Sequence, residues 1–298
     1  MAAKFSRSVK EARLGYIMVL PAVVCIVALA MIPLLTTLRY SLSSYRLQID
    51  RVPDLMGIQN FVSLLQDERF WASLRSTLTF TVVSVSFELL LGLAIALLIN
   101  QQFKGRGMVR AAVLVPWAIP TIISAQLWRL IFNDQMGVAN DILVRLGLIS
   151  GYKSWLGSTG SAMGAAIFSD IWKTMPFMAL LLTAGLSVIP GELYESAHVD
   201  GASRFRQFWH VTLPLLKPTI LVALIFRTLD AFRVFDLIYV LTGGGPANTT
   251  EVLSLYAYKT MFRNLDFGMG SALAIMIFIF VAVISVFYIR MLNQNSEL

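Results

Sequence analysis

The sequence has few charged residues, one cysteine and two histidines, and each shortage excludes a class of protein. Only 14% of the 298 residues are charged and 57% are hydrophobic, whereas soluble proteins carry roughly 25% charged residues. A water-soluble fold of this composition would expose large apolar patches. The single Cys25 excludes an intramolecular disulfide, and no group of cysteines or carboxylates surrounds His198 or His210. We therefore expect an integral membrane protein without a metal site.

Six apolar segments are each long enough to cross a bilayer, which takes about 20 mostly apolar residues. We predict an all-α membrane protein in which residues 1–298 form a single transmembrane domain. Prolines such as Pro116 and Pro120 lie inside these segments. They are expected to kink the helices, because neighbouring helices can satisfy the freed carbonyls. The predicted spans are residues 14–38, 76–100, 109–132, 162–190, 218–241 and 267–288.

The charge of the loops predicts which way the chain faces. The first apolar run is longer than the 7–15 residues of a signal-peptide core, so we interpret it as an uncleaved span. With a cytoplasmic N-terminus, the inner segments hold eleven basic and five acidic residues, a net charge of +6. The outer loops then hold nine and eight, a net charge of +1. Because basic residues accumulate in cytoplasmic loops, both termini are expected to be cytoplasmic. The formal charge of +7 therefore indicates a membrane surface and no nucleic acid.

Eight charged residues lie inside the predicted spans when Arg110 is counted with the loop before the third span. Charges at membrane depth are costly and are usually paired or functional. The fifth span is the most charged, with four residues of alternating sign at three-residue steps. Each step turns about 60° around a helix, so this series cannot all face lipid. The eight residues are Glu88, Arg129, Asp170, Lys173, Arg227, Asp230, Arg233 and Asp236.

Residues 189–217, between the fourth and fifth spans, have the residue order of a helix-turn-helix. The run 192–198 favours a helix, and Gly201 can end it by adopting a positive φ. Ser203 can cap a second short helix, and Pro214 marks the entry into the fifth span. A loop of this length and order predicts a docking site on the cytoplasmic face of the membrane.

The order of residues in this loop resembles the cytoplasmic loop motif of ABC importer permeases. That motif is Glu-Ala-Ala, three residues, Gly, nine residues and Ile-x-Leu-Pro. Glu-Ser-Ala at 195–197, Gly201 and Val-Thr-Leu-Pro at 211–214 match it in spacing, and Ser196 and Val211 are mild departures. The residues expected to contact an ATPase are Glu195, Ser196, Ala197, Asp200, Gly201, Leu213 and Pro214.

Three further segments resemble sugar permeases related to the maltose, glycerol-phosphate and trehalose importers. They are residues 57–61, 170–177 and 241–248. The resemblance implies a type I ABC importer with six transmembrane helices and a cytoplasmic coupling helix-turn-helix. It also implies the bacterial cytoplasmic (inner) membrane as the location.

The resemblance implies several partners. An external solute-binding protein would deliver a disaccharide or glycoside, such as a trehalose-like or maltose-like sugar. A second permease would complete the pathway, and two ATPase subunits carrying ATP and Mg would dock under the loops. This chain is expected to hold no cofactor and to be no enzyme, since it has no Gly-x4-Gly-Lys-Ser/Thr sequence.

Two interpretations of the intramembrane charges remain open. They are structural pairs that hold the fifth span to its neighbours, or some of them line the sugar pathway with nearby aromatic rings. The residues proposed for the pathway are Trp172, Lys173, Phe177, Asp230, Phe232, Arg233, Asp236 and Tyr239.

Two rival functions fit the sequence less well. In an ion-coupled secondary sugar carrier, Glu88 and Asp230 would couple ion and substrate, but such carriers often show repeated halves, and the loop motif would have no purpose there. An intramembrane enzyme would need a Ser/His/Asp set or a metal cluster, and the sequence offers neither.

Overall fold

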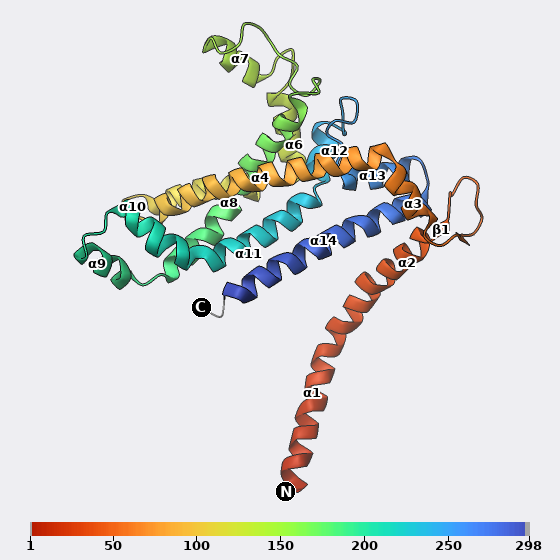
Figure 1. Ribbon diagram of the computed structural model, residues 1–298, viewed down its shortest axis with the longest axis horizontal. Coiled ribbons are helices and arrows are strands. Elements are labelled where there is room, and N and C mark those ends of the chain that lie inside the picture. Colours follow the sequence, from red (N-terminus) through yellow and green to blue (C-terminus); the bar gives the residue numbers. More distant parts are fainter. Residues whose placement is uncertain (1, 296–298) are drawn as a thin grey trace. The chain divides into compact units, whose positions relative to one another are not determined.

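The computed structural model describes residues 2–295, with side chains for residues 14–292, and most of these residues are helical (Figure 1). Three π-helical turns, labelled η, interrupt the helices, and the only described strands are two of two residues each. The elements are α1 (Ala2–Ile26), η1 (Val27–Met31), α2 (Ile32–Ser41), β1 (Ser43–Ser44), β2 (Asp54–Leu55), α3 (Gln59–Gln66), α4 (Glu68–Asn100), α5 (Arg106–Ala118), α6 (Thr121–Ile131), α7 (Val138–Arg145), α8 (Ala162–Val188), α9 (Gly191–Val199), α10 (Arg204–Gln207), η2 (Phe208–Thr212), α11 (Leu213–Phe232), α12 (Asp236–Leu241), α13 (Leu253–Tyr258), η3 (Lys259–Arg263) and α14 (Phe267–Asn295).

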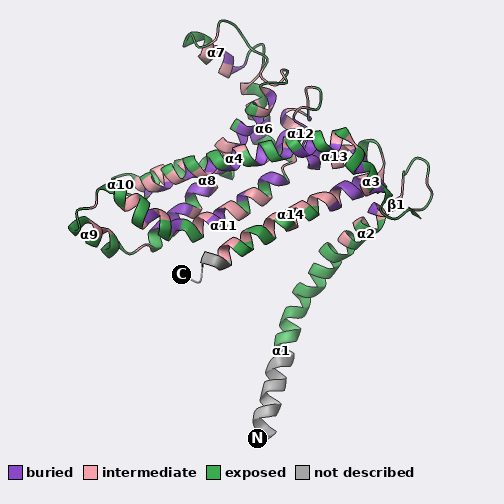
Figure 2. Cartoon of the chain, viewed as in Figure 1, coloured by how far each residue is buried: buried purple, intermediate pink, exposed green. Residues whose placement is uncertain are grey.

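The chain divides into two compact units, and the smaller comprises Ala257–Met276 and the described residues up to Gln66. Its long N-terminal helix exposes an apolar surface along almost its whole described length (Figure 2). After that helix, β1 and β2 pair antiparallel. Asn60 of α3 donates from Nδ2 to the carbonyl oxygens of Ser41 and Ser43, both at 2.9 Å, and so ties α3 to the end of α2.

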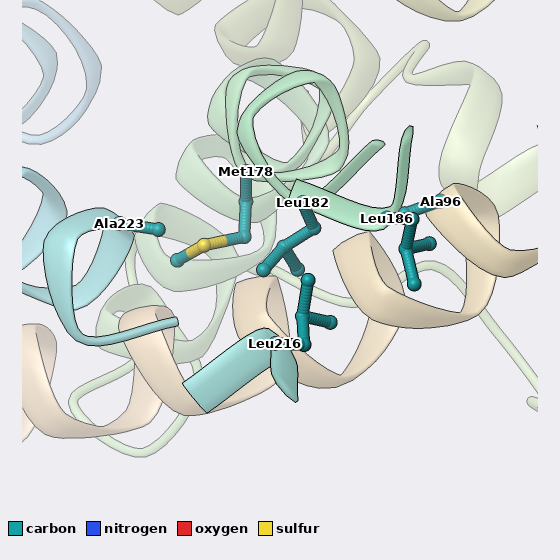
Figure 3. Packing of buried hydrophobic residues seen from close by; sticks show 6 residues of the cluster. All are labelled: Ala96, Met178, Leu182, Leu186, Leu216 and Ala223. Atoms are coloured by element: carbon teal, nitrogen blue, oxygen red, sulfur yellow. The ribbon is translucent and has the colours of Figure 1, made fainter. Parts of the chain in front are cut away.

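The larger unit, Asp67–Tyr256 with the chain from Ile277 on, is built around α4, α8 and α11. Figure 3 shows part of its apolar core, in which three α8 side chains pack between the other two helices. Glycines allow the close approach, because a Cβ on Gly92 would lie 2.8 Å from Met178 Cγ and one on Gly185 would lie 2.6 Å from Thr219 Oγ1. Small residues bring membrane helices together in this way. The core residues are Ala96, Met178, Leu182, Leu186, Leu216 and Ala223.

Five helical segments are long and apolar enough to cross a membrane, or six if one bent pair counts as a span. They confirm the expected all-α membrane class, and four differ from the predicted spans mainly in their ends. The five segments are Leu14–Ser41, Glu68–Asn100, Ala162–Val188, Arg204–Phe232 and Phe267–Leu292. The expectation of a single domain over 1–298 stays a prediction.

The predicted third span, 109–132, is broken. Helices α5 and α6 meet at a 91° bend, so the expected proline kink is an interruption of the helix. Proline disfavours helical geometry in the residue before it, and Ile119 is extended, with φ −75° and ψ 131°. Pro120 then precedes the first turn of α6.

The predicted fifth span, 218–241, runs past the end of its helix. One continuous helical segment runs from Arg204 to Phe232, through α10, η2 and α11. Residues 233–235 then interrupt it, and Asp236 and Tyr239 lie on the separate short helix α12. The sequence predicted that the four alternating charges wind around one helix. This prediction is wrong, because Asp236 lies on a different helix from Arg227 and Asp230. Hydropathy missed the break because 234–241 is as apolar as a helix interior.

Candidate coupling loop and charged cavity

The turn after α9 is a Schellman motif, in which the last carbonyls of a helix bond to a glycine and the residue after it. Gly201 has φ +76°, and its N–H donates to the His198 carbonyl at 3.0 Å. The Ala202 N–H donates to the Ala197 carbonyl at 2.9 Å. The predicted role of Gly201 as helix terminator is confirmed, and a Cβ at Gly201 would meet no described atom within 4 Å.

Ser203 caps the next helix as predicted, since its Oγ accepts from the Arg206 N–H at 3.4 Å. This second helix is not separate, however, because it continues through η2 into α11. Leu213 and Pro214 therefore lie inside a continuous helix, where Pro214 occupies the first turn of α11. Tyr194 and Thr212 join the two arms of the helix-turn-helix through a 3.0 Å hydroxyl contact.

The surface of this helix-turn-helix is uncovered. Glu195, Ser196, Asp200 and Gly201 are all exposed, and Ala197 is half-buried. Two large apolar side chains beside the turn, Val199 and Phe205, are 86% and 74% exposed. Val199 and Phe205 lie outside the fixed positions of the loop motif, so the motif gave no signal for them. An exposed surface with apolar side chains beside a rigid turn suits contact with another protein.

In the N-terminal half of α8, away from the end that leads into α9, a buried arginine contacts three carboxylates. Arg227 of α11 contacts Glu88 of α4 through Nε at 2.6 Å and Nη2 at 2.9 Å. It also contacts Asp170 of α8 at 3.2 Å and Asp230 at 2.6 Å. The Thr174 hydroxyl donates to Glu88 Oε1 at 2.7 Å. Arg227 and Glu88 are 3% and 0% exposed. For these two residues the contacts fit the interpretation that the intramembrane charges are structural pairs between helices.

A polar cavity of about 180 Å³ opens beside this cluster, between α6, α8, α11 and α12. Three basic and three acidic side chains line it: Asp170, Lys173, Arg227, Asp230, Arg233 and Asp236. Thr121 reaches its wall because the break in the third span starts α6 there. Such a set of charged donors and acceptors can bind a ligand rich in hydroxyl groups.

Of the eight predicted pathway residues, four line this cavity, namely Lys173, Asp230, Arg233 and Asp236. The other four do not line it, and each packs against another aromatic ring. Ring centroids lie 5.5 Å apart for Trp172 and Trp128, 5.6 Å for Phe177 and Trp117, 5.9 Å for Phe232 and Phe280, and 5.3 Å for Tyr239 and Phe235. Phe235 itself lines the cavity, but it lies between Arg233 and Asp236 and no feature of the sequence distinguished it from its apolar neighbours.

A second ion pair, between a half-buried arginine and a buried glutamate, lies at the start of α4. Arg69 contacts Glu251 through two bonds of 2.7 and 3.0 Å and lies 4.4 Å from the ring centroid of Tyr256. The Tyr256 hydroxyl donates to Asp67, which caps α4. Burial and this hydrogen bond raise the pKa of Tyr256 above its usual value. These contacts attach the segment 251–256 to the start of α4. This segment follows the glycine-rich turn 243–245.

Residues 88–295 match the sequence family described as the binding-protein-dependent transport system inner membrane component. The chain belongs to this family. It is an ABC importer permease of the sugar type, a multi-pass membrane transport subunit and no enzyme.

Among its relatives is the trehalose/maltose transport system permease protein MalF of Thermococcus litoralis, 47% identical over 282 residues, 94% of each chain. The trehalose transport system permease protein SugA of Mycobacterium tuberculosis is 40% identical and covers 99% of this permease and 94% of its own length. A solved bacterial ABC transporter involved in the import of the acidic polysaccharide alginate has a chain with a TM-score of 0.84. That chain is 28% identical in sequence to this permease, and the match covers 98% of this permease and 99% of the alginate transporter chain.

Proposed function

We propose that this permease forms half of the pathway of an ATP-driven importer for a disaccharide or glycoside of the trehalose or maltose type. The observation that carries the proposal is the exposed Schellman turn at Gly201, which presents the loop motif on a rigid helix-turn-helix. The similarity to permeases named for trehalose and maltose supports the sugar class.

In this proposal, residues 195–201 dock in a cleft of an ATPase subunit. The second helix of the loop runs without interruption into α11, so a displacement of the turn moves the whole helix. Helix α11 carries Arg227, which contacts α4 and α8. ATP-driven closure of two ATPases, which hold ATP and Mg, is thereby transmitted to the three-helix core.

The cavity beside Arg227 is the proposed contribution of this chain to the sugar pathway. Lys173, Arg233 and Asp236 supply hydrogen-bonding groups, and Phe235 supplies a ring face. A second permease completes the pathway, and an external solute-binding protein delivers the sugar. One solved relative is an alginate importer in complex with an alginate pentasaccharide-bound periplasmic protein, which supports a partner of that kind. Both termini and the α9–α10 turn face the cytoplasm.

The experiment is purification of the tagged chain from its native membrane in mild detergent, with identification of the proteins that accompany it. We expect a second permease and an ATPase. Replacement of Gly201 by tryptophan should release the ATPase and leave the permease pair intact. Gly147→Trp is the matched control, because Gly147 also has a positive φ, of 70°, and open space around it, but it lies in the loop predicted to be external.

A chain that purifies alone and moves sugar in liposomes under an ion gradient without ATP would contradict the proposal. It would support the secondary carrier. Equal loss of the ATPase in both tryptophan variants would contradict the assignment of the docking turn. Uptake of trehalose and maltose by the reconstituted complex, with ATP present, then tests the sugar class.

A further inference from the structure

An apolar cavity of about 250 Å³ lies between α4, α5 and α8, apart from the charged cavity. Its walls include Ile99, Leu114, Leu180 and Ala184. Thr183 also reaches it, but its hydroxyl donates to the Ala179 carbonyl of its own helix at 2.7 Å. The polar group is thus satisfied within α8, and the cavity presents apolar surface to any occupant.

One charged side chain borders this apolar cavity. Arg110 lines it, and its Nε is fully buried with no hydrogen-bond partner among the described residues. A buried guanidinium N–H without an acceptor is costly. The position therefore favours a ligand that brings an anionic oxygen to Arg110 and an apolar portion to the space beyond it.

The chain supplies more positive charge on the same side. Arg106 lies one turn before Arg110 on the same helix face, and Lys104 precedes α5. Lys104 and Arg106 line an open hollow together with Gln102 and Phe103. Gly105 is the N-cap residue that precedes α5, and no side chain caps this helix. A helix N-terminus itself attracts anions. Arg106, Arg110 and Leu114 follow one another at about 6 Å steps along the helix, from the loop toward the membrane interior.

We propose that this face binds an anionic phospholipid, with its headgroup phosphate on Arg106 and Arg110 and part of an acyl chain in the cavity between α5 and α8. The order of charge at the loop end and apolar surface deeper in the helix matches the order of groups in a lipid. Basic pockets between membrane helices at the cytoplasmic side bind anionic headgroups in this manner. The inference does not rest on ATP coupling or on the identity of the sugar.

The probe is dioleoylphosphatidylglycerol, added to the purified and delipidated full chain and counted as bound lipid by native mass spectrometry. The double variant Arg106→Gln/Arg110→Gln should bind it about 25-fold more weakly, because each basic residue near an anionic headgroup contributes about fivefold. Ala184→Phe, which fills an exposed part of the cavity and keeps both arginines, should also weaken binding. Arg290→Gln is the control for the loss of one positive charge elsewhere, since Arg290 is exposed on α14 and does not line the cavity. This variant should bind the lipid as the unmodified chain does.

A photoreactive benzoylphenylalanine at position 184 provides a second measurement in native membranes, independent of the stability of the arginine variants. A cross-link to phospholipid supports the proposal. A cross-link mainly to another protein chain overturns it and assigns this face to the second permease or an ATPase. Equal binding of dioleoylphosphatidylcholine, or displacement of the lipid by inorganic phosphate at millimolar concentration, also overturns it.

Discussion

The turn at Gly201 and the cluster around Arg227 lie in the same compact unit. The contacts that stabilise the turn join residues close in sequence, whereas those that stabilise the cluster join residues far apart in sequence. The turn is closed by hydrogen bonds between residues at most five positions apart. Arg227 instead binds Asp170 and Glu88, which are 57 and 139 positions away. The turn is exposed and open, and the cluster is buried between three helices. Substitutions in the turn should therefore change local order and partner binding, whereas substitutions in the cluster should change the stability of the whole unit.

The largest expected effect is that of Arg227→Met. It leaves Glu88, which is 0% exposed, without its cation. Removing one partner of a buried ion pair costs about 3–5 kcal/mol. Thermal unfolding of the detergent-purified chain measures the loss. Arg233→Met is the control, because Arg233 is exposed and its Nε donates to the Leu229 carbonyl at 3.0 Å. Its loss should stay within about 0.5 kcal/mol. Equal losses would show that the cluster is not a stabilising centre.

Within the cluster, Glu88→Gln should destabilise the protein more than Asp230→Asn. Glu88 accepts three bonds in a buried site, and hydrogen bonds to charged groups contribute about 1.5–3 kcal/mol. The Asp230 side chain is 70% exposed, so solvent screens its pair and the loss should be below about 1 kcal/mol. The same thermal measurement compares them. If Asp230→Asn instead lowers sugar uptake without lowering stability, Asp230 acts in the cavity; a larger stability loss at Asp230 than at Glu88 contradicts the burial argument.

The features that could be predicted from the sequence are those that depend on local contacts, as at the turn. The features that depend on long-range contacts, as at the cluster, could not be predicted. The role of Gly201 as helix terminator and the cap at Ser203 depend on neighbouring residues, and both were predicted correctly. The contact of the loop motif with an ATPase stays a prediction. The pairing of Arg227 with Glu88 depends on how α4 and α11 pack, and no local pattern encodes it. The break after Phe232 was missed because hydropathy is continuous across it, so Asp236 was placed on the wrong helix.

At the turn, Gly201→Ala should loosen the Schellman motif, because a left-handed conformation costs an L-residue about 1–2 kcal/mol. Gly201→Asn, with a larger side chain, should cost less, since asparagine tolerates this conformation. Hydrogen exchange of the Ala202 amide reports the difference and should accelerate at least about fivefold in the alanine variant. Thermal unfolding of the unit should hardly change in either variant. Faster exchange in the asparagine variant would show that bulk, and not backbone strain, disturbs the turn.

The smallest expected effects come from two serines in the same loop that should respond to alanine with opposite signs. Ser203 caps α10 through a long 3.4 Å bond in an exposed position, so Ser203→Ala should cost about 0.5 kcal/mol, the low end for a helix cap. Ser196 lies inside α9, is exposed, and departs from the family motif, in which alanine stands. Alanine is the better helix former by about 0.5 kcal/mol, so Ser196→Ala should slightly protect the α9 amides from hydrogen exchange. Each change removes one serine hydroxyl from the same loop. Opposite effects on hydrogen exchange would therefore be due to the position of the serine, at the helix cap or inside the helix. If both variants exchange faster, the loop depends on its serines for another reason, and local helix energetics do not describe the turn that the ATPase is proposed to contact.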